Sequence, residues 1–388
     1  MNSAAYLIDA VRTAGGRRGG RLSGVHAVDL GAISLDAIVD RTGLDPAAID
    51  DVIMGCVTQA GEQSMHVGRN CVLASKLPQS VPAVTIDRQC GSSQQAIQFA
   101  AQAIMSGTQD VVIAAGVESM TRAPMGSSLL AEHGVTPVSD AIKKRFGVDG
   151  FTQFAGAEMM AKKYRFSRDE LDAYALESHK RAAAATDAGA FKAEIVSVDV
   201  TLPEGGNAMH DTDEGIRADA SAEAMAELKT LVPGGFITAG NASQICDGSS
   251  AALVVSENAL KTHNLTPMAR IVNLTVTAGD PVIMLEEPLF ATDRALERAG
   301  MEIDDIDLYE VNEAFAPVPM AWLKHTGADP SRLNVNGGAI ALGHPLGASG
   351  AKLMATLLHA LKARGKRYGL QTMCEGGGIA NVTIIEAL

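Results

Sequence analysis

The stretch GGAIALGHPLGASG, residues 337–350, is the most informative part of the chain, because it places His344 among five glycines directly before a helical pattern. Glycine permits close backbone approach and positive φ angles, and Pro345 stiffens the turn. The pattern indicates a loop that delivers an imidazole to a crowded site, or a glycine-rich turn with an incidental histidine. The helix is expected to be amphipathic, with these residues on its apolar face: Leu353, Met354, Leu357, Leu358 and Leu361.

The composition narrows the class of protein. The chain has 388 residues, of which 47% are hydrophobic and 20% are charged, so it can bury a large core in two or more domain-sized units. A net charge of −13 argues against binding to nucleic acid or to an anionic membrane. Five cysteines without a Cys-x-x-Cys pair fit neither a disulfide framework nor a structural zinc site. We therefore expect no bound metal, a reducing cytoplasmic location, and no signal peptide or membrane span.

Short β-branched segments alternate with helical patterns, which indicates an α/β protein. The predicted strands cover residues 4–8, 52–54, 111–115, 271–274, 308–311 and 370–373.

The two ends of the chain repeat one plan. Cys90 is followed by a helical pattern, a strand and the sequence GVES at 116–119. Ala348 is likewise followed by a helical pattern, a strand and the sequence CEGG at 374–377. This repeat predicts two similar αβα halves that meet face to face.

A segment of different amino-acid composition separates the two halves. Residues 120–240 are polar and rich in glycine and alanine, with a helical stretch at 167–190. We interpret them as an insertion or lid on the N-terminal half. That half would comprise residues 1–119 and be completed by about 241–265. The C-terminal half would then be 266–388. A third independent domain is the alternative, and the lack of an obvious strand set makes it less attractive.

Cys90 lies after a strand-like segment and at the entry of a helix. The positive end of a helix dipole favours thiolate over thiol, so Cys90 is a candidate nucleophile. The alternative is a small buried side chain without a chemical role.

Two further segments combine reactive groups with strand ends. Cys374 precedes Gly376, Gly377 and Gly378, whose backbone N–H groups can converge on an oxygen that gains negative charge; the alternative is an inert thiol in a flexible loop. Asn312 stands at another strand end, where it can act in the site or as a helix N-cap. Two cysteines, a histidine and an oxyanion site suggest carbon–carbon chemistry on a thioester, because one thiolate can carry the acyl group while the other moves a proton.

These segments resemble the thiolase family of acyl-CoA:acetyl-CoA C-acyltransferases, and the resemblance covers essentially the whole chain. It implies the thiolase fold, in which two αβα halves form a five-layered αβαβα core with an inserted loop domain. The matching stretches are QCGS at 89–92, GVESMT at 116–121, TAGNAS at 238–243, NEAFA at 312–316, the His344 loop, and CEGGG at 374–378.

The resemblance implies a role for each site residue. Cys90 would attack the keto carbon of a 3-ketoacyl-CoA while His344 removes its proton. Cys374 would protonate the acetyl-CoA enolate and then deprotonate the incoming CoA. One oxyanion site would be His344 with a water held by Asn312, and the other the backbone N–H groups of Cys90 and Gly376.

The resemblance also implies substrate contacts and partners. Arg217 and Ser243 match positions that contact CoA, and Phe315 would line the acyl pocket. Arg217 could equally be a solvated surface charge, and Phe315 plain core. CoA would be a substrate, with no permanently bound cofactor. The family suggests a homodimer or a homotetramer.

One departure from the family bears on the substrate. FTQFAGAE, residues 151–158, stands where many thiolases have a Met-Gly pair and where biosynthetic members often have a histidine. It therefore favours a degradative 3-ketoacyl-CoA thiolase, and similar Gln-Phe sequences occur in thiolases for bulky or sterol-derived chains. The alternatives are a biosynthetic acetoacetyl-CoA thiolase, a cysteine hydrolase that needs no CoA, and a non-catalytic acyl-CoA-binding protein, against which Cys90 and His344 argue.

Overall fold

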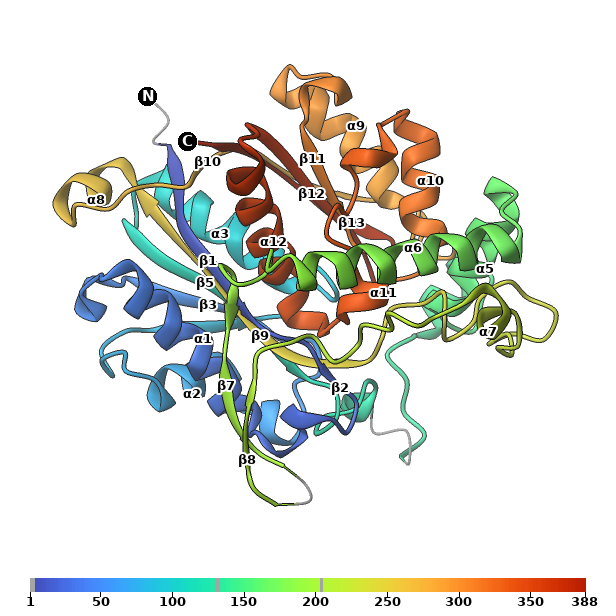
Figure 1. Ribbon diagram of the computed structural model, residues 1–388, viewed down its shortest axis with the longest axis horizontal. Helices are drawn as coiled ribbons and strands as arrows, with labels where there is room; N and C mark the ends of the chain where they lie inside the picture. Colours follow the sequence, from blue (N-terminus) through green and yellow to red (C-terminus); the bar gives the residue numbers. More distant parts are fainter. Residues whose placement is uncertain (1–3, 130–132, 203–204) are drawn as a thin grey trace.

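The computed structural model describes residues 4–129, 133–202 and 205–388 (Figure 1). One continuous path of strands runs through it in the order β11-β12-β13-β10-β1-β9-β5-β3-β4. The strands are β1 Ala5–Thr13, β2 Gly16–Arg17, β3 Asp51–Gly55, β4 Ala83–Ile86, β5 Val111–Ser119, β6 Ile195–Val196, β7 Val198–Thr201, β8 Asn207–His210, β9 Cys246–Ser256, β10 Ala269–Ala278, β11 Leu308–Val311, β12 Tyr368–Glu375 and β13 Ile379–Ala387. The helices are α1 Ala27–Thr42, α2 Val67–Ala74, α3 Ser92–Ser106, α4 Asp140–Phe146, α5 Gln153–Tyr164, α6 Arg168–Asp187, α7 Ala222–Ala226, α8 Glu257–Thr262, α9 Glu287–Ala299, α10 Pro317–Thr326, α11 Ala339–Leu342 and α12 Ser349–Arg364.

The strand path consists of two sheets with the same connectivity. In the N-terminal half, β3 is parallel to β5, β5 is antiparallel to β9, and β9 is antiparallel to β1. In the C-terminal half, β11, β12, β13 and β10 repeat this pattern in the same order. β1 and β10 join the two sheets. The central helices α3 and α12 also end alike, each at a left-handed glycine, Gly107 or Gly365. The predicted repeat is therefore confirmed.

The two sheets enclose the central helices. Helices α1 and α2 cover the outer face of the N-terminal sheet, α3 and α12 lie between the sheets, and α9 and α10 cover the outer face of the C-terminal sheet (Figure 1). The central layer is filled by alanines and larger aliphatic residues of α3, α12 and the facing strands. This arrangement confirms the five-layered αβαβα core.

The helix after His344 is more deeply buried than its sequence predicts. We expected one apolar face, but α12 is buried on every side from Ser349 to Leu361, including the polar side chains Lys352 and His359. The reason is its central position, because α3 and both sheets pack around it.

The segment between the halves contains α4, α5, α6 and α7, and it also contains strands that its sequence did not indicate. β7 and β8 form a two-stranded ribbon, and β6 pairs with β1 of the N-terminal sheet. α6 packs against α11 and α5 packs against α10, so this segment also contacts the C-terminal half. The boundaries at 120 and 240 stay a prediction. No helix among residues 4–129, 133–202 and 205–388 is long and apolar enough to cross a bilayer.

Candidate active site

Cys90 lies in the turn between β4 and α3, and its side chain is almost completely buried, with 8% exposure. The turn requires a positive φ of 48° at Gln89. Burial, and then the charge of Glu375, raises the pKa of the Cys90 thiol to about 12. The backbone at the helix entry lowers the pKa of Cys90, as expected, but burial outweighs this effect. The resting Cys90 is a neutral thiol among these apolar side chains: Val57, Met120, Leu346, Leu353 and Met373.

His344 is held between α11 and α12 with its ring in a defined orientation. Nδ1 lies 2.5 Å from Ser349 Oγ, and this hydroxyl donates to the Pro345 carbonyl at 3.0 Å. Because the Ser349 proton is already used, Oγ accepts from Nδ1–H, which leaves Nε2 without a proton. Burial, and then the positive charge of Lys352, lowers the pKa of His344 to about 3. His344 is therefore a neutral imidazole whose Nε2 can accept a proton.

The His344 loop is fixed by contacts from other parts of the chain. The His344 N–H donates to the Gln244 carbonyl at 3.0 Å. The buried Lys352 Nζ donates to the Leu342 and Gly343 carbonyls at 2.5 and 3.0 Å. These contacts satisfy backbone groups that a tight glycine-rich turn would otherwise leave buried and unpaired.

Asn312 follows β11 and faces His344. Its Nδ2 lies 3.4 Å from His344 Nε2, and its Oδ1 is a buried acceptor with no partner among the described residues. Such an atom fits a water or a polar substrate atom. The N-cap alternative is wrong, because α10 begins only at Pro317 with Ala316 as its N-cap.

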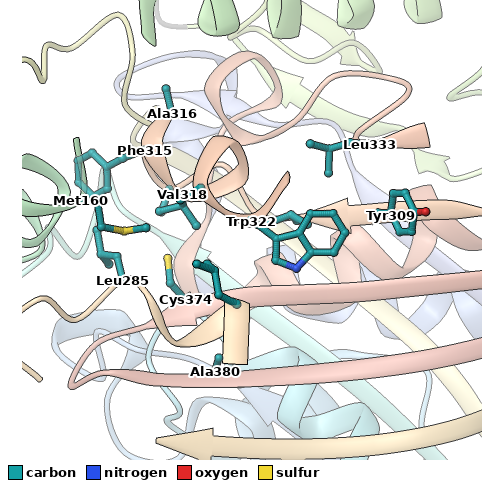
Figure 2. Packing of buried hydrophobic residues seen from close by; sticks show 14 of the residues in the cluster. Met160, Leu285, Tyr309, Phe315, Ala316, Val318, Trp322, Leu333, Cys374 and Ala380 are labelled. Carbon is teal, nitrogen blue, oxygen red and sulfur yellow. The ribbon is translucent and has the colours of Figure 1, made fainter. Parts of the chain in front are cut away.

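Cys374, near the end of β12, is fully buried. Figure 2 shows it beside Leu285 and Val318, in the hydrophobic cluster that also contains Phe315. Burial, and then the charge on Cys90, raises the pKa of Cys374 well above its ordinary value. Glu375, the neighbour of Cys374, packs against Gly91, the neighbour of Cys90, so the two cysteines stand in segments that touch although they come from different halves of the fold.

The glycines after Cys374 bring a second backbone segment to Cys90. Gly377 and Gly378 have positive φ values of 87° and 75°, which reverse the chain between β12 and β13. A Cβ added at Gly376 would lie 2.8 Å from Gln89 Oε1, so Gly376 lies directly against the Cys90 turn. The predicted oxyanion residues Cys90 and Gly376 thus come from touching segments.

The predicted substrate contacts are more scattered. Arg217 lines a hollow of about 290 Å³, together with His179 and Gln244. Ser243 is half-buried next to Gln244, and its N–H donates to the Ala314 carbonyl at 2.9 Å. A larger hollow of about 940 Å³ lies beside the C-terminus and contains none of the predicted site residues.

Phe315 and Phe154 form an aromatic pair. Phe315 is 3% exposed and packs in the core of its cluster. Its ring meets that of Phe154 edge-on at 5.7 Å between centroids, and Phe154 is 37% exposed. Phe154 is therefore the ring of this pair that is available to a ligand.

Comparisons with known proteins identify the family of this chain. Residues 5–258 match the N-terminal thiolase domain and residues 265–387 match the C-terminal thiolase domain. The chain belongs to the thiolase family.

Several thiolases resemble the chain over nearly its full length. The steroid 3-ketoacyl-CoA thiolase FadA6 of Mycobacterium tuberculosis is 54% identical, with 99% of this chain and 94% of the relative covered. A beta-ketoadipyl-CoA thiolase of Acinetobacter baylyi is 43% identical, with 98% and 99% covered. The crystal structure of human mitochondrial 3-ketoacyl-CoA thiolase superposes with a TM-score of 0.90 at 37% identity, with 100% and 99% covered. The enzyme class predicted from the sequence, an acyltransferase of the thiolase family, is thereby confirmed.

Sequence reasoning gave no role to three residues of this thiolase site: Glu118, Ser349 and Glu375. Glu118 and Glu375 stand at the ends of buried strands within motifs that we had already singled out. A carboxyl group in an apolar strand was the available signal, because a buried carboxyl needs a compensating partner or a chemical role.

Proposed function

We propose that this chain cleaves 3-ketoacyl-CoA with CoA to give acetyl-CoA and a shortened acyl-CoA, through an acyl-enzyme on Cys90. The observation that carries the proposal is a neutral His344 with an unprotonated Nε2, together with the packing of the segment after Cys374 against the Cys90 turn. A single thiol with a base would suffice for hydrolysis, whereas carbon–carbon cleavage needs a second proton carrier.

In the first half-reaction, the Cys90 sulfur attacks the keto carbon while its proton moves to His344 Nε2. The backbone N–H groups of Cys90 and Gly376 stabilise the resulting oxyanion. The bond between C2 and C3 then breaks, and its electron pair forms an enolate that protonated His344 and an Asn312-bound water stabilise. Cys374 gives its proton to C2, which releases acetyl-CoA and leaves a Cys374 thiolate.

In the second half-reaction, the Cys374 thiolate takes the proton of the incoming CoA thiol. The CoA sulfur attacks the acyl group on Cys90, and collapse of this intermediate expels Cys90, which regains its proton from His344. All groups end in their starting protonation states. The neutral resting site agrees with this scheme, because charge is created only while substrate is reacting.

We further propose that the physiological direction is degradative and that the acyl chain is bulky. The FTQFAGAE segment, the exposed Phe154 ring and the 54% identity to a steroid 3-ketoacyl-CoA thiolase support this. CoA binds as a substrate, with Arg217 and Ser243 as proposed contacts and Phe315 behind the acyl pocket. A homodimer or homotetramer in the cytoplasm completes the proposal.

Variants of the two thiols test the mechanism. Cys90→Ala should abolish acyl-enzyme, as measured by mass spectrometry of intact protein after exposure to a reactive acyl-CoA. Cys374→Ala should still be acylated but should lose thiolysis of 3-ketoacyl-CoA. Cys71→Ala is the matched control, because Cys71 is buried away from the site in the N-terminal core. Turnover of Cys374→Ala at the parental rate would exclude the two-thiol mechanism.

A panel of 3-ketoacyl-CoA substrates of increasing bulk tests the substrate class, with acetyl-CoA release as the readout. We expect kcat/KM to rise from acetoacetyl-CoA to polycyclic side-chain substrates. A preference for acetoacetyl-CoA would favour the biosynthetic alternative, and product formation without free CoA would favour a hydrolase. Inertness toward every substrate would favour the binding-protein alternative.

A further inference from the structure

Glu375 is a buried carboxyl group that the proposed mechanism does not use. It ends β12, between Cys374 and Gly376, and it is fully buried. Neither carboxyl oxygen has a hydrogen-bond partner among the described residues. The side chain fills the space beside Gly91, because a Cβ added at Gly91 would overlap Glu375 Oε1. A buried carboxyl without donors is costly in its ionised form, so its position needs an explanation.

The position of Glu375 relates it to the proposed oxyanion donors. Gly91 directly follows Cys90, and Glu375 directly precedes Gly376. The carboxyl group therefore packs against the same two segments that carry the Cys90 and Gly376 N–H groups. A negative charge here repels both a Cys90 thiolate and an oxyanion bound by these donors, whereas a protonated carboxyl does not.

Burial favours the protonated form of Glu375, against the effect of its polar neighbours. The Cys90 turn contributes two titratable groups that face Glu375, the Arg88 guanidinium and the Cys90 thiol. Strand β12 contributes the Cys374 thiol. The opposite strand β13 contributes Asn381, whose backbone N–H interacts with the carboxyl without hydrogen-bond geometry. Burial raises the pKa of Glu375 to about 8, and the positive charge of Arg88 opposes this shift. Asn381 Oδ1 also has no partner among the described residues and lies beside the same Gly91 site, where it can accept a hydrogen bond from the protonated carboxyl group.

We infer that Glu375 is a positioning residue for acyl transfer: its protonated carboxyl leaves the Cys90 and Gly376 donors free to stabilise negative charge, and its ionisation suppresses acylation of Cys90. This inference rests on the proposed function. It predicts that the rate of Cys90 acylation falls at alkaline pH. The group whose ionisation causes this fall is Glu375, which exchanges no proton with the substrate.

The experiment compares wild type with Glu375→Gln, which is neutral at every pH. The rate of Cys90 acylation by acetyl-CoA is measured in single turnovers between pH 6 and pH 10 by quenching and mass spectrometry. For wild type, we expect a fall of about tenfold or more, with a midpoint near the Glu375 pKa of about 8. For Glu375→Gln, we expect the fall to disappear while the rate at pH 6 stays within about threefold of wild type.

Arg88→Gln supplies a second, independent readout. Removal of this cation should raise the Glu375 pKa further and move the alkaline fall to higher pH. A merely structural role for Glu375 would produce neither the loss of the alkaline fall in Glu375→Gln nor its shift to higher pH in Arg88→Gln. The Arg88→Gln profile tests the inference by itself if Glu375→Gln does not fold. Identical pH profiles of wild type and Glu375→Gln, or an unshifted fall in Arg88→Gln, would overturn the inference about Glu375 but leave the proposed function intact. Absence of acyl-enzyme from wild type at every pH would overturn the proposed function itself.

Discussion

The two halves of the molecule each direct one strand-end carboxyl toward the start of the other half's central helix. In the N-terminal half, Glu118 on β5 reaches Gly347, which precedes α12. In the C-terminal half, Glu375 on β12 packs against Gly91, which precedes α3. β5 and β12 occupy the same place in the repeated strand order. The arrangement is therefore the same, but the surroundings of the two carboxyl groups differ.

Glu118 is saturated with hydrogen bonds and Glu375 has none. Glu118 accepts from the backbone N–H groups of Val57 at 2.9 Å, Thr58 at 2.9 Å and Gly347 at 2.8 Å, and from Gln63 Nε2 at 3.0 Å. A satisfied buried group rigidifies its surroundings, and here it ties the His344 loop to the N-terminal sheet. An unsatisfied one costs stability, and such costs concentrate at functional sites. The repeated fold thus uses one carboxyl group for rigidity and, by our inference, the other for chemistry.

The largest effect expected from this comparison is that of Glu118→Ala. The truncation leaves the buried N–H groups of Thr58 and Gly347 and the part-buried N–H of Val57 without acceptors. At about 1–3 kcal/mol for each buried group, the free energy of unfolding should fall by roughly 5 kcal/mol. The released Gly347 should also loosen the His344 loop and lower the rate of Cys90 acylation. Urea unfolding and single-turnover acylation measure the two effects.

Glu118→Gln is the control for Glu118→Ala. Its amide oxygen can still accept from some of the donors, so its loss of stability should be smaller than that of Glu118→Ala. Equal stability of Glu118→Ala and wild type would show that the hydrogen bonds around Glu118 do not fix the loop.

Glu375→Gln should have the opposite effect on stability. In the unfolded chain, Glu375 ionises near its ordinary pKa of 4.5, whereas in the folded protein it holds its proton up to about pH 8. Between these values the unfolded state binds fewer protons, so rising pH destabilises wild type but not the variant. The difference should be absent near pH 4 and reach roughly 5 kcal/mol in favour of Glu375→Gln above pH 8.

The measurement is the free energy of unfolding of both proteins at pH 4, 6 and 9. A constant difference between them across this range would show that Glu375 ionises in the folded protein as it does in the unfolded chain. Such a result would remove the contrast with Glu118.

The features that the sequence predicted correctly are those set by local spacing and by order along the chain. A helix, a strand and a glycine-rich turn follow both Cys90 and Ala348. This repeat predicts the two halves, because each half builds the same supersecondary unit. The predicted site residues follow strand ends or precede helices, and the segments that carry Cys90 and Gly376 lie against each other. The joint catalytic role of Cys90, His344 and Cys374 stays a prediction.

The remaining features depend on packing between distant segments. α12 has a sequence that suits one buried face, and only the second sheet and α3 bury it completely. β6 has two residues and forms by pairing with β1, so no local sequence pattern predicts it. The pKa of Cys90 depends on how many apolar side chains exclude water from it, and that number is not visible in the sequence around Cys90.

The smallest effect that we predict separates two serines that begin the central helices. Ser92 Oγ accepts from the Arg88 N–H at 2.9 Å and donates to the Gln89 carbonyl at 2.6 Å, so it closes its own turn. Ser349 donates to its own turn in the same way but also accepts from His344 Nδ1.

Ser349→Ala should therefore lower kcat for thiolysis by about tenfold, because one lost hydrogen bond of about 1–1.5 kcal/mol frees His344 to place its proton on Nε2, where it cannot act as a base. Ser92→Ala should cost a similar amount of stability, measured by thermal unfolding, with a smaller loss of kcat. If both variants lost kcat equally, Ser349 would act only by closing its turn, and the two halves would use this serine alike. A loss confined to Ser349→Ala would instead show that the C-terminal half has adapted the shared helix start to orient its base.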